Sequence, residues 1–130
     1  MDVQAALSRI HAPKGVTSLI AGVMSGDFDP IRDQDAAGAT LARARAELEK
    51  IKTAQANCKS DWAYWGYEGD KAYWRATVSI LEAAELVGAD NLPDVPAPNT
   101  ENCVVMDACW KVEQFGAEVL KRAKESKEAA

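Results

Sequence analysis

Apolar residues recur along most of this chain at steps of three and four, the spacing that places them on one side of an α-helix. The first such run, Val3 to Ile10, ends in a turn at residues 11–15 that contains proline and glycine. The run from Val16 to Met24 predicts a second short helix. A loop follows, and Asp29 with Pro30 suits the start of a helix. The aspartate side chain can accept from the free backbone N–H groups of the first turn, and proline has no N–H group that needs a partner there.

The longest periodic stretch begins near Ile31 and carries a heptad seam. The seam positions are Leu41, Ala44, Leu48, Ile51, Gln55, Cys58, Trp62 and Trp65. Such a stripe packs against another helix at a shallow angle, as in a helical bundle. The flanking charges, such as Arg43 and Glu47, pair on neighbouring turns and predict a solvated face.

Two glycines, Gly66 and Gly69, predict a break in this helix, because glycine supplies the left-handed backbone that helix ends often need. The first long helix should therefore end near Trp65, and the next should run from about Asp70 to Val87. Two adjacent apolar stripes on the second helix predict burial over a broad arc, with Gly88 as its C-terminal cap.

The segment from Ala89 to Asn99 contains three prolines and no helical period, which predicts an extended connector. An extended chain rises about 3 Å per residue, so the last helix can run parallel to the one before it. Asn99 or Thr100 is expected to cap that last helix. Its inner side is predicted by Val105, Ala108, Val112, Phe115, Val119 and Arg122, with Trp110 nearby.

These patterns predict an all-α fold: a small bundle of about five helices, two short at the N-terminus and three longer in the core. The proline-rich connector precedes the last helix. The 130 residues match the usual size of one domain, so residues 1–130 are expected to form a single all-α domain. The hydrophobic share of 48% and the charged share of 27% are those of an ordinary globular protein.

The formal net charge of −5 repels phosphate backbones and anionic membrane surfaces, so neither nucleic acid nor membrane is an expected partner. The longest apolar run, Val16 to Met24, is far shorter than the roughly 20 residues that span a bilayer. The N-terminal stretch lacks the basic region and cleavage site of a signal peptide. A cytoplasmic location is therefore expected.

Three cysteines cannot all pair within one chain, and without a secretion signal Cys58, Cys103 and Cys109 are expected to be reduced thiols. On a helix, the spacing of six between Cys103 and Cys109 turns the two sulfurs apart, which disfavours a metal or redox pair. Small buried hydrophobic side chains are the favoured interpretation of all three, and the pattern leaves their reactivity open.

No other motif predicts a reaction, a metal or a cofactor. The acidic loop at residues 27–35 resembles a calcium loop, but Arg32 replaces its glycine and Gly38 replaces its final acid. The single histidine, His11, lies in a turn and is expected at the surface. Asp61 and Asp70 would serve as an acid–base pair only if folding joined them. A non-enzymatic role is favoured.

Six of the nine aromatic residues fall between Trp62 and Trp74, interleaved with charged residues. Tryptophan and tyrosine anchor interfaces and line ligand pockets, because each has a large apolar body and a polar atom. The candidate partner-binding or ligand-binding residues are Asp61, Trp62, Tyr64, Trp65, Tyr67, Glu68, Tyr73 and Trp74.

Three interpretations of the aromatic cluster remain open: core packing, a protein interface, or a small-ligand pocket. Tyr64 and Tyr67 discriminate between them because neither falls on the seam. The leading prediction is a non-enzymatic adaptor or assembly subunit that docks a protein partner, a second copy included, through an aromatic-rich corner between two helices. The alternative is a protein that binds a small molecule or organic cation, or an accessory enzyme subunit, with the rings lining the pocket.

Overall fold

The computed structural model describes residues 1–13 and 36–129, and within them the protein is all-helical, without a strand. This confirms the all-α fold class. The helices are α1 (Val3–Ser8), α3 (Leu41–Asn57), α4 (Asp61–Val87) and α5 (Val105–Ala129). The predicted helix from Val16 to Met24 and the acidic loop at 27–35 lie outside the described residues. No helix in the described ranges is long and apolar enough to cross a membrane.

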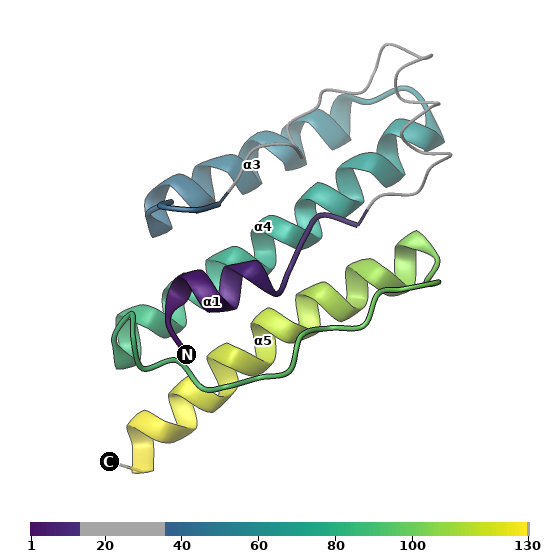
Figure 1. Ribbon diagram of the computed structural model, residues 1–130. Helices are drawn as coiled ribbons and strands as arrows, with labels where there is room; N and C mark the ends of the chain where they lie inside the picture. The colour runs from purple at the N-terminus through teal and green to yellow at the C-terminus, as the bar shows by residue number, and fades with distance from the viewer. Residues whose placement is uncertain (14–35, 130) are drawn as a thin grey trace.

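The three long helices lie side by side, and α3 runs antiparallel to α4 whereas α5 runs parallel to it (Figure 1). Residues 88–104 have neither helix nor strand, and they carry the chain back along α5 to the end at which α4 begins (Figure 1). The N-terminus holds this segment in place, because Met1 N donates to Leu92 O at 2.7 Å and Leu92 N donates to Met1 O at 3.0 Å.

The break between the two central helices lies at residues 58–60, so the prediction of a helix end near Trp65 and a new start near Asp70 is wrong. Ser60 starts α4: its backbone is extended and its side-chain oxygen accepts from Ala63 N at 3.1 Å. The predicted end of α4 is confirmed, because Gly88 is the C-terminal cap.

The two glycines that predicted the break lie inside α4, and one of them permits close packing instead. A Cβ atom on Gly69 would lie 2.1 Å from the carbonyl oxygen of Pro13, so only glycine lets the N-terminal segment approach this helix. The predicted seam is consequently divided between two helices: Ala44 and Ile51 are buried on α3, whereas Trp65 is exposed on α4.

The last helix also begins later than predicted. Asn99 and Thr100 precede α5 by several residues, and Asn99 Oδ1 accepts from Glu101 N at 3.1 Å in a turn. The predicted inner side is confirmed at Val112, Phe115 and Val119, which are all buried. The prediction is wrong at Arg122, which is exposed, whereas its neighbour Ala123 is buried.

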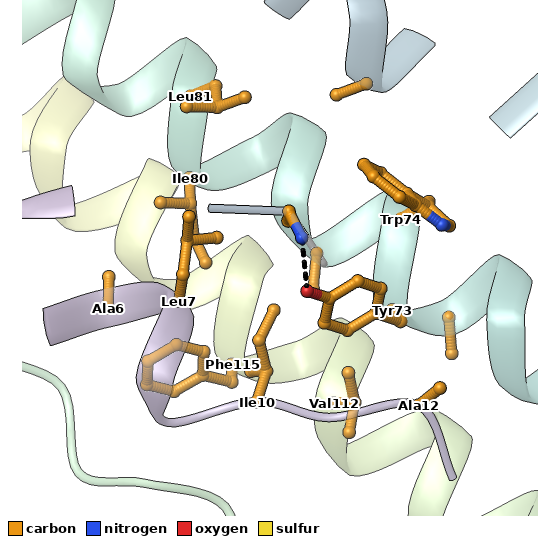
Figure 2. Packing of buried hydrophobic residues seen from close by; sticks show 14 of the residues in the cluster. Ala6, Leu7, Ile10, Ala12, Tyr73, Trp74, Ile80, Leu81, Val112 and Phe115 are labelled. Atoms are coloured by element: carbon orange, nitrogen blue, oxygen red, sulfur yellow. Dashed lines mark hydrogen bonds between the residues drawn. The ribbon is translucent and has the colours of Figure 1, made fainter. Parts of the chain in front are cut away.

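Helix α4 forms the centre of the core and packs against α1, α3 and α5. Figure 2 shows residues from the N-terminal segment packed against two other helices: Leu7 of α1 lies beside Ile80 of α4, and Ile10 lies close to Phe115 of α5. Trp74 and Ile80 are fully buried. The core is therefore one continuous cluster organised around α4.

Helices α4 and α5 approach each other closely at Gly116, where an added Cβ atom would lie 2.6 Å from the Cα atom of Ala76. We expect Gly116→Val to lower the free energy of unfolding by about 2 kcal/mol or more, because the two backbones must separate to admit the side chain. Urea unfolding followed by circular dichroism measures this change. The matched control is Ala117→Val at the exposed neighbouring position, with an expected loss of about 0.6 kcal/mol or less. Equal losses in the two variants would contradict the close approach.

Candidate functional site

The aromatic cluster lies within one helix, α4, and does not form a corner between two helices. Successive residues of a helix point in different directions, so the rings are spread around α4. Tyr67, Tyr73 and Trp74 are buried in the core, whereas Tyr64 is 42% exposed and Trp65 is 37% exposed. The two discriminating tyrosines are thus divided between core and surface. The side chain of Trp62 lies outside the described part.

The buried rings have packing and hydrogen-bonding roles. The hydroxyl oxygen of Tyr73 accepts a hydrogen bond from Ala36 N at 3.0 Å, which ties the chain before α3 to α4 (Figure 2). Tyr73 and Trp74 meet edge to face, with ring centroids 5.4 Å apart. Tyr64 and Trp65 form a similar pair at 5.6 Å. These contacts favour core packing for the buried rings and leave the second pair accessible from solvent.

Glu68 belongs to a polar clasp between α3 and α4, formed by Gln55, Glu68 and Lys71. Gln55 Nε2 donates to Glu68 Oε1 at 2.6 Å, and Lys71 Nζ donates to Gln55 Oε1 at 2.9 Å. Lys71 Nζ also lies 2.5 Å from Glu68 Oε1. Each of the three side chains is bonded to the other two, so the clasp fixes the relative position of the helices.

Burial acts to raise the pKa of Glu68, but hydrogen bonds from Lys71 and Gln55 and the charges of Lys71 and Arg75 outweigh it. The net pKa of Glu68 is below its ordinary value of 4.5. Glu68 is therefore a carboxylate at neutral pH, which suits a structural ion pair and makes it a poor proton donor.

The remaining titratable candidates also occupy separate places. Asp61 is exposed and Asp70 is buried nine positions along the same helix, so they do not form an acid–base pair.

Burial, followed by the charges of Glu68 and Glu113, raises the pKa of Cys109 to about 12, so this thiol stays protonated at neutral pH. Cys58 and Cys103 are half-buried free thiols. The described ranges contain no group of three or more His, Cys, Asp or Glu residues placed to hold a metal ion.

Sequence reasoning missed the exposed hydrophobic residues at the beginning of α5. Val104, Met106 and Trp110 are 63%, 61% and 62% exposed. The sequence could have indicated the exposure of Trp110, because it lies two residues before Val112 and helical geometry places these two side chains on different faces. The helices α4 and α5 begin at the same end of the bundle (Figure 1), and Tyr64, Trp65 and these residues all lie in or just before the first two turns of one of these helices. We call these five residues the apolar end: Tyr64, Trp65, Val104, Met106 and Trp110.

A groove of about 300 Å³ runs beside Trp110, between α5 and the segment at 95–99. Its volume lies at the lower limit of typical ligand pockets. The residues that line it include Val95, Pro96, Pro98, Trp110, Phe115 and Glu118. The groove thus joins an exposed aromatic ring to an apolar wall and a carboxylate.

Comparison of the chain with protein-family models, with curated proteins and with solved structures finds no match. Functional inference for this protein therefore depends on the geometry of its own residues.

The clasp predicts a pH-dependent contribution to stability. Because the pKa of folded Glu68 is lowered, its contribution is present above the ordinary value of 4.5 and is lost as the pH falls through the folded value. We expect Glu68→Gln to cost about 1 kcal/mol at pH 7 and progressively less in acid. Urea unfolding at several pH values measures the difference. The control is Glu125→Gln at an exposed position of α5. A cost that stays constant down to pH 2 would contradict the lowered pKa.

Proposed function

We propose that this protein is a non-enzymatic interaction module that docks a protein partner through the apolar end. The observation that carries the proposal is the exposure of Val104, Met106 and Trp110, each between 61% and 63%. Tryptophan, tyrosine and methionine are enriched at interfaces, where burial of their large side chains stabilises the complex.

The grouping of these residues supports the proposal more than the exposure of any one of them. Single exposed hydrophobic residues are normal on a protein surface. In the described ranges, however, the five large exposed hydrophobic residues all lie at the beginning of α4 or α5 or immediately before it. Met106 and Trp110 are four residues apart, so they are neighbours on the surface of α5.

The charge around the apolar end favours a partner with basic residues. Asp61, Glu101 and Asp107 are exposed carboxylates in the same two stretches of chain. The whole chain carries a net charge of −5, which attracts cationic surfaces over a longer range. A partner with an apolar centre and a basic rim would therefore complement this surface.

The chemistry-bearing side chains of α4 and α5 support a non-enzymatic role. Glu68 is held as an anion within the clasp, and Cys109 is protonated inside the core. An organic-cation pocket built from the aromatic cluster has less support, because three of its candidate rings, Tyr67, Tyr73 and Trp74, are buried.

Site-specific photo-crosslinking tests the proposal. A benzoylphenylalanine placed at Met106 should give one dominant protein adduct in extracts of the source cells, and the same group at Lys121 on exposed α5 should not. The captured protein is then purified and its affinity for the unmodified chain is measured. We expect Trp110→Ala to weaken that affinity by about tenfold or more, and Lys121→Ala to leave it unchanged.

Sedimentation velocity tests whether the partner is a second copy of the chain. A dimer that dissociates in the Met106→Ala, Trp110→Ala double variant would support the same surface. A strict monomer without a discrete adduct at position 106 would contradict the proposed function.

A further inference from the structure

We propose that the groove beside Trp110 binds a short, extended peptide segment that contains proline and, at one end, a basic residue. This inference rests on the proposed function, because it names the chemistry of the partner segment that the apolar end would meet.

The shape of the groove favours an elongated occupant. Trp110, Gln114 and Glu118 line it at intervals of four residues, so they follow one side of α5. Eight residues of α-helix rise about 12 Å, at 1.5 Å per residue. A polyproline II segment rises 3.1 Å per residue, so about four of its residues match that length.

The segment at 95–99, which forms one wall of the groove, is unsuited to a bound peptide that would pair with it as an added β-strand. Pro96 and Pro98 have no backbone N–H group, so alternate positions of this wall cannot donate to an added strand. A polyproline II peptide needs no such pairing, because its backbone stays solvated. It is recognised through its side chains, which pack into aromatic-lined grooves.

The groove offers an apolar surface for proline rings. Trp110 is 62% exposed and is the first residue along α5 that lines the groove. Val95 and Phe115 are only 6% and 4% exposed, so they form the apolar base between α5 and the opposite wall. A proline ring placed against the indole would bury apolar area on both partners without leaving a backbone donor unpaired.

The two charged residues of the groove have different roles. Lys111 Nζ donates to Asn99 O at 2.9 Å and lies 3.3 Å from Cys103 Sγ, so its charge is directed at the wall. Glu118 Oε1 accepts from Arg122 Nε at 2.8 Å, and its side chain is 39% exposed. A carboxylate has about four lone-pair sites, so Glu118 can also accept from an incoming basic residue.

A small organic cation fits this arrangement less well than a peptide does. The backbone positions of Trp110 and Glu118 are about 12 Å apart along the helix axis, a span that an extended peptide matches better than a small cation does. A peptide with proline at the Trp110 end and arginine at the Glu118 end reaches both residues at once.

Fluorescence anisotropy with a labelled peptide tests the proposal. The probe is fluorescein-Ala-Pro-Pro-Ala-Pro-Arg-Gly, and two controls replace either all its prolines by alanine or its arginine by glutamate. We expect saturable binding to the wild-type chain below about 1 mM, with clear weakening for both control peptides. Trp110→Ala should weaken binding about tenfold and Glu118→Gln about threefold. Because Trp110 is largely exposed, Trp110→Ala should keep the wild-type melting temperature.

Tyr64→Ala separates this proposal from the proposed function. Tyr64 belongs to the apolar end but does not line the groove, so its loss should weaken protein docking and leave peptide affinity unchanged. Equal affinity for the all-alanine peptide, or no saturation at 1 mM, would overturn the peptide groove. Competition by tetramethylammonium chloride as strong as that by unlabelled peptide would overturn it in favour of a cation site. If the crosslinked partner still depends on Met106 and Tyr64 after such a result, the docking function stands without the groove.

Discussion

The close contact between α4 and α5 sets the arrangement of the described molecule. Gly116 lies against the backbone of Ala76, where a Cβ atom would meet Ala76 Cα at 2.6 Å. Near this point Arg75 Nη1 lies 3.2 Å from Glu113 Oε1, which adds an exposed ion pair across the same two helices. Because the helices are parallel and in contact along much of their length, their N-terminal ends lie at the same end of the bundle (Figure 1). The apolar end follows directly from this arrangement.

The same parallel arrangement produces the groove. Two consecutive helices can run parallel only if the chain returns along their length, and residues 88–104 make that return beside α5. Proline suits this segment because it has no backbone N–H group that would need a hydrogen-bonding partner. Val95 of the same segment still reaches the core, with 6% exposure. One topological feature therefore supplies a wall of the groove and places Trp110 at its edge.

The position of α4 at the centre explains why the aromatic cluster divides. Helices α1, α3 and α5 cover different sides of α4, so Tyr67, Tyr73 and Trp74 enter the core. Tyr64 and Trp65 lie in its first turns, where they remain partly exposed. The clasp of Gln55, Glu68 and Lys71 lies just beyond them and holds α3 against α4. Binding through the exposed pair would thus act on a helix that is already held on several sides.

The sequence by itself determined the all-α class, the end of α4 at Gly88, and the buried line of Val112, Phe115 and Val119. These features depend on helical periodicity and capping, which are properties of a few neighbouring residues. The cap of Ser60 marks the start of α4 locally, but tertiary structure decided that the helix continues through Gly69, because this glycine admits the backbone of Pro13 and does not end a helix. It also decided the exposure of Trp110 and the groove beside it, because a side chain is buried or exposed according to which distant segment packs over it.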